Sequence, residues 1–147
     1  MIPYYRQEKD WTCGPVCARM ILQSIGIKKT EKELAKFLNT NKKEGTRNRS
    51  FLELSEKYKL NYKVERNSNI EEFKKSIKSG YKIIVGYYLE SEKQGHLAVV
   101  RKIEKGYIHL LDPEFGPKTK YKIEYFLKIW KNDPKVDKEK RWFIGFK

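Results

Sequence analysis

Apolar residues in the first half of the chain recur every three or four positions, the spacing of one face of an α-helix. The apolar positions of the first such run are Val16, Met20, Ile21 and Ile25. Pro15 suits the first turn of a helix, where its missing N–H is not needed. Gly26 suits the end, because glycine adopts left-handed backbone angles without strain. The pattern predicts a helix over residues 13–25 with one face in a core.

Three more helices are predicted downstream. Thr30-Glu-Lys-Glu33 has the pattern of a capping box, in which side chains of the first turn bond its free N–H groups, so a helix should run to about Leu38. Asn69 is a good N-cap for a helix that ends at Gly80. Between them, residues 50–59 carry an apolar stripe formed by Phe51, Leu52, Leu54 and Tyr58.

The remaining elements have the pattern of β-strands, with β-branched and aromatic residues bounded by turn residues. They predict strands at 61–66, 81–89, 96–104, 107–111, near Tyr121 and at 141–146, and one more helix at 123–130. Helices that precede a mostly antiparallel sheet define the α+β class. We see no internal repeat or linker, so we predict one α+β domain over residues 1–147, its N-terminal helical half packed on the sheet.

The hairpin turn near Gly106 decides which side chains of its two strands share a face, because a shift of one residue flips every side chain. A two-residue turn, Lys105-Gly106, would place His96 and Asp112 on opposite faces. A three-residue loop, beginning at Glu104, would place His96 and Asp112 on one face as diagonal neighbours.

We predict the three-residue loop, because a glycine in its last position readily adopts the left-handed angles required there. In that register His109 moves to the other face of the sheet, beside Arg101. The prediction therefore favours a pair between His96 and Asp112 and leaves His109 as a packing residue.

The composition indicates a folded and strongly basic protein. Of the 147 residues, 39% are hydrophobic and 14% aromatic, and the formal net charge is +14. Most of the excess is lysine spread over nearly every segment, without the concentrated basic stripe typical of nucleic-acid-binding proteins. We therefore expect no specific nucleic-acid partner, and a basic surface would equally steer an acidic peptide.

The chain has neither of the two sequence signals for membrane insertion or secretion. No apolar run approaches the length needed to span a membrane, and the segment from Met1 to Arg6 lacks the basic-then-apolar form of a signal peptide. We expect a cytoplasmic monomer.

The two cysteines do not predict a disulfide. Cys13 and Cys17 are four residues apart on a predicted helix, where Cβ atoms lie about 5–6 Å apart, and a disulfide needs about 3.5–4.5 Å. Cys17 is interpreted as a small buried hydrophobe. A zinc site of both cysteines with His96 and His109 is a weaker alternative, because the histidines lack the short spacing of structural zinc sites. We therefore expect no metal and no cofactor.

Cys13 stands where nucleophilic chemistry favours a thiol. A helix N-terminus carries unpaired N–H groups and partial positive charge, which stabilise a thiolate over a thiol. Far downstream, His96 opens one apolar run and Asp112 closes the next. A nucleophile needs a base, and the base needs an orienting group; such partners meet in the fold and not along the chain. Cys13, His96 and Asp112 are therefore the candidate nucleophile, base and orienting acid.

These residues resemble the motifs of the bacteriocin-processing peptidases, the peptidase C39 family, and of their stand-alone relatives. The matching features are Gln7, five intervening residues and Cys13-Gly14-Pro15, followed by Gly95-His96 and Asp112-Pro113. The resemblance implies a papain-like fold in which Cys13 attacks, His96 acts as base and then acid, and Asp112 holds the imidazole tautomer. It also implies an oxyanion hole, the donors that stabilise charge on the substrate oxygen, formed by the Gln7 amide and the Cys13 N–H.

The resemblance further implies a cysteine peptidase that acts on a peptide or protein substrate. Family members are often N-terminal domains of peptide-exporting transporters and cut leader peptides after paired glycines. The resemblance therefore implies a leader peptide cut after small residues as one expected substrate, although this chain contains no transporter segment. Two alternatives stay open: a non-catalytic peptide-binding module on the same fold, and an acyl transferase that uses the same acyl-enzyme.

Overall fold

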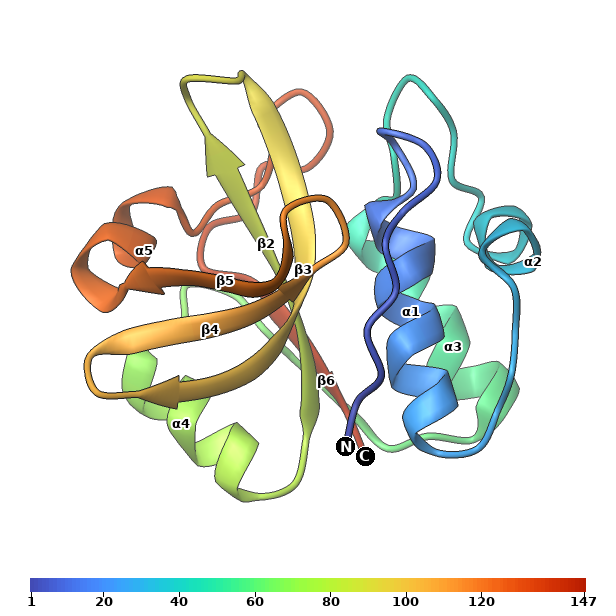
Figure 1. Cartoon of the computed structure of the whole chain (residues 1–147), viewed down its shortest axis with the longest axis horizontal. Coiled ribbons are helices and arrows are strands. Elements are labelled where there is room, and N and C mark those ends of the chain that lie inside the picture. Colours follow the sequence, from blue (N-terminus) through green and yellow to red (C-terminus); the bar gives the residue numbers. More distant parts are fainter.

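Helices cover both faces of a central sheet, so that the molecule has three layers (Figure 1). The computed structural model describes all 147 residues. In chain order the elements are α1 (Cys13–Ser24), α2 (Glu31–Phe37), the 3-10 helix η1 (Asn48–Phe51), α3 (Leu52–Tyr58), β1 (Tyr62–Glu65), α4 (Ile70–Lys78), β2 (Lys82–Leu89), β3 (Gln94–Glu104), β4 (Tyr107–Asp112), β5 (Gly116–Lys122), α5 (Ile123–Ile129) and β6 (Phe143–Phe146). None of the helices combines the length and the apolar character needed to cross a membrane.

The helix starts follow the local signals in the sequence. The capping box of α2 is present: the Glu33 N–H donates to Thr30 Oγ1, and the Thr30 N–H donates to the Glu33 carboxylate, both at 3.1 Å. Asn69 caps α4 by accepting a hydrogen bond from the Glu72 N–H at 2.9 Å. The predicted helices at 30–38 and 69–80 are thus confirmed, and the one predicted at 50–59 is formed by η1 and α3.

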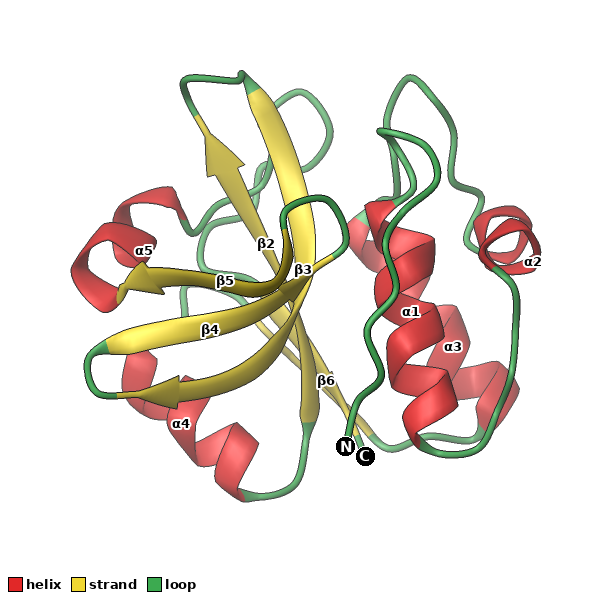
Figure 2. Ribbon diagram, in the orientation of Figure 1, coloured by secondary structure: helices red, strands yellow, loops and turns green.

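The sheet is antiparallel throughout, with the strand order β1-β6-β2-β3-β4-β5 (Figure 2). Strands β2 to β5 are joined in sequence as neighbours, and the C-terminal β6 inserts between β1 and β2. This arrangement confirms the predicted α+β class, with helices α1 to α3 on one side of a mostly C-terminal sheet.

Each face of the sheet forms its own core, because successive side chains of a strand point to opposite faces. Toward α1, α2 and α3, the sheet contributes Ile84, Leu97, Val99, Leu111, Ile144 and Phe146, and Trp142, which directly precedes β6, joins the same core. Toward α4 and α5, it contributes Ile83, Val85, Tyr87, Leu89, Ala98, Val100, Ile108, Leu110 and Phe143. The first core fixes α1, and therefore its first residue, against β3.

The turn between β3 and β4 has two residues, so the predicted three-residue loop is wrong. Glu104 pairs with Tyr107 across the turn, and Lys102 pairs with His109. The two turn residues have φ angles of 52° and 81°. Positive φ at both central positions is the requirement of the tight hairpin turn whose twist matches the strands. His109 consequently pairs with Lys102 and not with Arg101, which lies unpaired next to that pair.

A β-bulge at Arg101 restores the register on which the site depends. The pairing shifts between Val100 and Lys102, and beyond the shift Val100 pairs with Leu110. A bulge inserts one unpaired residue into one strand, which offsets the partner strand by one position. His96 and Asp112 therefore share a face, as predicted, although the cause is a bulge and not the turn.

Candidate active site

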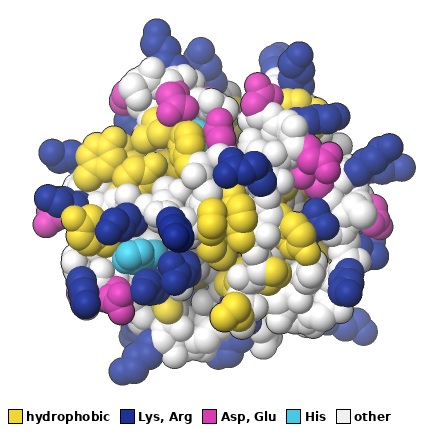
Figure 3. Space-filling model, in the orientation of Figure 1, with side chains coloured by type: hydrophobic (Ala, Val, Ile, Leu, Met, Phe, Trp, Pro, Cys, Tyr) yellow, Lys and Arg dark blue, Asp and Glu magenta, His cyan; other side chains and the backbone are white.

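A cavity of about 150 Å³ lies between the helical half and the sheet half. In the view of Figure 3, a notch at the top of the molecule separates the two halves, and Asp and Glu side chains gather beside it. The residues that line the cavity include Trp11, Cys13 and Thr46 from the helical half and Tyr87, Gly95 and His96 from the sheet half. The expected nucleophile and the expected base therefore border one cavity. No hydrogen bond joins their side chains in this state.

Cys13 is the first residue of α1, as predicted, and its sulfur lies near the backbone N–H groups of Leu97 and Gly14. Burial nevertheless raises the pKa of the Cys13 thiol to about 12. The N–H groups oppose this rise, whereas the negative charges of Asp112 and Glu114 add to it. The expected lowering of the pKa is thus not found, because the loss of hydration outweighs the favourable helix end. In this state Cys13 is a thiol.

Gly14 lets the wall of the cavity approach the start of α1. A Cβ atom at position 14 would lie 2.2 Å from Thr46 Oγ1 and 2.5 Å from Thr46 Cβ. Thr46 is itself fixed by a hydrogen bond of 2.6 Å to Thr40 Oγ1. Glycine next to the cysteine is therefore a packing requirement at this position.

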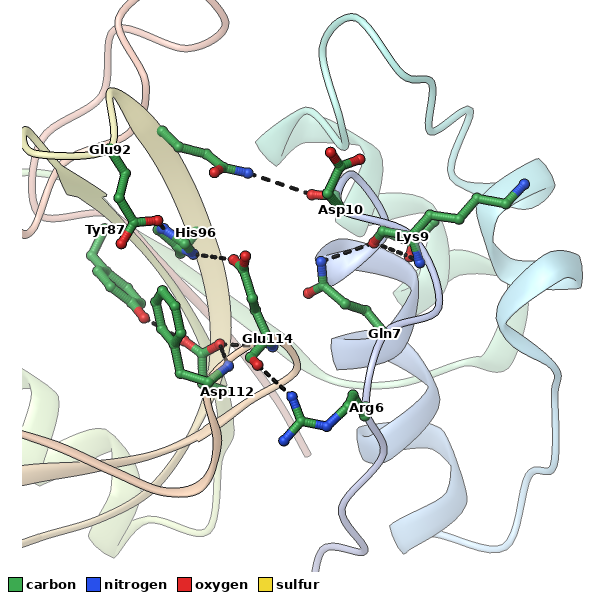
Figure 4. A network of polar contacts seen from close by, with 12 residues as sticks. Arg6, Gln7, Lys9, Asp10, Tyr87, Glu92, His96, Asp112 and Glu114 are labelled. Atoms are coloured by element: carbon green, nitrogen blue, oxygen red, sulfur yellow. Dashed lines mark hydrogen bonds and ion pairs between the residues drawn. The ribbon is translucent and has the colours of Figure 1, made fainter.

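His96 is held by side chains from the sheet and from the turns between its strands (Figure 4). It pairs directly with Tyr87 across β2 and β3, and the two rings stack at 5.2 Å between centroids with 19° between their planes. Phe115 contacts the imidazole with a centroid distance of 4.9 Å. Nδ1 lies 3.1 Å from Glu114 Oε2, and the buried Nε2 has no hydrogen-bond partner, its nearest carboxylate oxygen being 3.7 Å away on Glu92.

Asp112 lies close to His96 without touching it. The residue is only 1% exposed, and both carboxylate oxygens are engaged. Oδ1 accepts hydrogen bonds from the N–H groups of Glu114 and Phe115, each at 2.9 Å, and Oδ2 accepts one from the Tyr87 hydroxyl. The structure therefore brings Asp112 to the site, but the direct hydrogen bond expected with His96 is absent.

Gln7 lies beside the same turn. Its N–H donates to the carbonyl oxygen of Pro113 at 3.0 Å, which ties the N-terminal segment to the end of β4. Its side-chain Nε2 donates to the carbonyl oxygen of Lys9 at 2.9 Å, and Oε1 is buried without a partner. The amide is thus near the start of α1, but in this state its donor bonds the backbone of its own loop.

Three residues of the site are absent from the sequence-based prediction: Tyr87, Glu114 and Phe115. In the sequence, Tyr87 is one of several aromatic residues of a predicted strand, and nothing marks it as a residue of the site. Its place opposite His96 follows from the pairing of β2 with β3, which no local pattern specifies. For Glu114 and Phe115 a signal exists, because an aspartate side chain commonly bonds the N–H groups two and three residues ahead.

The four residues of the zinc alternative do not converge. Cys17 is fully buried in the core of the helical half, and His109 lies near the opposite end of the hairpin. No three His, Cys, Asp or Glu side chains are grouped so that they could hold a metal ion.

Residues 131–140 form one side of the cavity, and hydrogen bonds between side-chain amides hold this segment in place. Asn48 and Asn132 exchange two hydrogen bonds of 3.0 Å, and Asn48 also donates to Glu139 at 2.9 Å. The segment packs directly on the backbone of β2 and β3. A Cβ atom at Gly86 would lie 2.6 Å from the Asn132 Nδ2, and one at Gly95 would lie 3.2 Å from the Asp133 Cβ.

A cysteine at the start of a helix, packed against an antiparallel sheet that carries a histidine, defines the papain-like class of fold. The chain belongs to the peptidase C39 family, whose family model matches residues 1–133. Three solved structures are similar. The peptidase domain of Streptococcus ComA, a bifunctional ABC transporter involved in quorum sensing, has a TM-score of 0.76 and 18% identity over 99% of this chain and 98% of that chain.

The second is a putative C39-like peptidase from Bacillus anthracis, with a TM-score of 0.77 and 17% identity over 99% of this chain and 94% of that one. The third is a double glycine motif protease from an AMS/PCAT transporter, solved in complex with the leader peptide. Its TM-score is 0.75, with 19% identity over 99% of this chain and 91% of that one. None of the curated protein sequences matches the chain. At these identities the similar structures establish the papain-like fold.

Proposed function

We propose that this chain is a cysteine peptidase that hydrolyses a peptide bond through an acyl-enzyme. The observation that carries the proposal is the cavity bordered by Cys13 at the start of α1 and by His96 on β3, in a chain of the peptidase C39 family. A thiol and an imidazole that border one cavity can activate each other once a substrate displaces water from it. Membership of the family supports the same chemistry.

In this proposal His96 removes the proton from Cys13, and the sulfur attacks the carbonyl carbon of the scissile bond. His96 then returns the proton to the leaving amine as the C–N bond breaks, which leaves an acyl-enzyme. Water attacks the acyl carbon and gives a proton to His96, which passes it to the Cys13 sulfur as the C–S bond breaks, so that the carboxylic acid and the free thiol are released. Burial raises the pKa of Cys13 and so favours the neutral thiol, and in the proposal the proton passes to His96 within the catalytic cycle.

Gln7 and Asp112 have supporting roles in the proposal. The Gln7 amide, with the Cys13 N–H, stabilises the negative oxygen of the tetrahedral intermediate, after Nε2 exchanges its bond to Lys9 for one to the substrate. Removal of one such donor lowers turnover about a hundred- to a thousandfold in comparable sites. Asp112 orients the imidazole. We propose a leader peptide cut after small residues as the substrate, which the similar protease solved with its leader peptide supports.

The test is cleavage of a synthetic peptide with paired glycines, followed by mass spectrometry, with wild type, Cys13→Ala and His96→Ala. We expect one cleavage after the glycines in wild type and none in either variant. A matched peptide with leucines in place of the glycines should stay intact. An added amine acceptor separates hydrolysis from transfer, because a transferase yields the amide product. Binding of the peptide without any cleavage would replace the proposal with a binding module.

A further inference from the structure

The carboxylate of Asp112 is linked to His96 only through intermediate groups. One oxygen accepts the Tyr87 hydroxyl hydrogen bond, and Tyr87 stacks on the imidazole at 5.2 Å. The other oxygen holds the N–H groups of Glu114 and Phe115, whose side chains contact the same imidazole. Every contact between Asp112 and the histidine therefore passes through one of these three residues.

We propose that Tyr87 is a positioning residue through which Asp112 orients His96, an inference that rests on the proposed peptidase function. The hydroxyl of Tyr87 is fixed at one end by Asp112, and the face of its ring fixes the plane of the imidazole. Because Tyr87 and His96 are direct cross-strand partners, the pleat of the sheet sets their separation. Tyr87 is completely buried, so solvent does not compete for either contact.

Two further aromatic side chains restrict the position of the Tyr87 ring. Tyr121 meets it edge-on at 5.6 Å between centroids, and Phe126 contacts it at 6.4 Å. A phenylalanine at position 87 would fill this aromatic cluster equally well. The hydroxyl therefore serves polar contacts and not the packing: it bonds the Asp112 carboxylate and also meets the Tyr121 hydroxyl, and a buried carboxylate is costly unless hydrogen bonds compensate the lost hydration.

The two nitrogen atoms of the imidazole face the carboxylates of two other residues. Glu114 lies at Nδ1 and Glu92 faces Nε2 at 3.7 Å, so these are the charged groups that face the ring. Both side chains are partly exposed, Glu114 by 32% and Glu92 by 41%, so solvent competes for their contacts with the ring, as it does not for those of Tyr87. The buried Tyr87 is the rigid element of the set.

The inference is tested with the peptidase assay on Tyr87→Phe, Asp112→Asn and the double variant. Tyr87→Phe keeps the ring and removes the hydrogen bond to Asp112, so kcat should fall about tenfold while KM stays the same. The double variant should be no slower than Asp112→Asn alone, because both substitutions break one link. Tyr88→Phe, which removes a hydroxyl from the next residue on the other face of β2, is the matched control and should behave as wild type.

A second readout does not depend on turnover. The chain has only two histidines, so the ring-proton NMR signals of His96 and His109 can be followed without further labelling. In Tyr87→Phe the His96 signals should move and broaden as the ring gains freedom, whereas those of His109 stay in place. Thermal unfolding of each variant shows whether it is folded.

Three outcomes overturn the inference. A wild-type kcat for Tyr87→Phe with unchanged His96 signals would make Tyr87 a packing residue. Multiplicative effects of Tyr87→Phe and Asp112→Asn would show that the two residues act on His96 independently. A His96→Ala variant as active as wild type would remove the proposed peptidase mechanism and this inference with it, which separates that failure from the first two.

Discussion

Cys13 and His96 reach the same cavity by different physical means. On the helical side, the sulfur is placed by the first turn of α1, and it lies near two backbone N–H groups, that of Gly14 on α1 and that of Leu97 across the cavity on β3. On the sheet side, the imidazole is placed by side chains: Tyr87 on its face, and Glu114 and Phe115 around it.

This difference indicates which substitutions should disturb each side of the site. A position set by backbone tolerates changes of side chain as long as the backbone keeps its path, so glycine positions and helix caps matter most there. A position set by interlocked side chains fails when one member is replaced, even though the strand remains intact. The following predictions test that contrast.

The largest effect is expected from Cys13→Ala. Peptide cleavage should fall to background, at least about a thousandfold, because the nucleophile is lost while the start of α1 keeps its backbone contacts. Cys17→Ala, one turn further along the same helix, is the control: it should keep the activity and lose about 1–2 kcal/mol of unfolding free energy, since Cys17 is fully buried. Cleavage rate and chemical denaturation measure the two. Residual cleavage by Cys13→Ala would point to another nucleophile.

Next in size is the effect of a methyl group at Gly14. Gly14→Ala should lower the unfolding free energy by about 1–3 kcal/mol, because the new Cβ would overlap both Oγ1 and Cβ of Thr46. Gly86→Ala on the sheet side should cost less, since its Cβ meets the end of the Asn132 side chain. Urea unfolding of both variants gives the comparison, and an equal or reversed order would contradict it.

A smaller effect is expected at the cap of α2, away from the cavity. Thr30→Ala removes the side-chain half of the capping box and should lower the unfolding free energy by about 1 kcal/mol. The cleavage rate should stay at the wild-type value, because α2 carries no residue of the site. A loss of activity at full folding would show that the helical side depends on more than the backbone of α1.

The smallest effect concerns the charge beside the thiol. Glu114→Gln should lower the pKa of Cys13 from about 12, because a nearby negative charge disfavours the thiolate. The rate of alkylation by iodoacetamide follows the thiolate, so its midpoint should move to lower pH. Glu90→Gln, an exposed change on the sheet side, should leave the midpoint where it is. A midpoint that rises in Glu114→Gln would mean that Glu114 acts mainly through His96.

The sequence predicts the helical half better than the geometry of the site, and the reason is the range of the forces involved. The caps at Thr30 and Asn69 and the start of α1 at Cys13 depend on neighbours within one helical turn, so local patterns reveal them. The pairing of Tyr87 with His96 depends on two strands that meet only in the folded sheet.

The pKa of Cys13 shows the same limit. The favourable helix end is visible in the sequence, but the burial that outweighs it is a property of the assembled cavity. The length of the hairpin turn is wrong in the prediction by only one residue. The sequence correctly predicts the left-handed conformation of Gly106, but Lys105 also adopts positive φ, and the turn is therefore one residue shorter than predicted.

The bulge at Arg101 makes the register at the tip of the β3–β4 hairpin independent of the register at its other end. The pairing register at the turn differs by one residue from the register beside His96 and Asp112, because Arg101 is left unpaired between the two. An insertion or deletion at the tip, compensated at Arg101, would therefore leave the histidine and the acid on the same face. Through such paired changes the tip of this hairpin is free to diverge during evolution while the end beside the cavity keeps its arrangement.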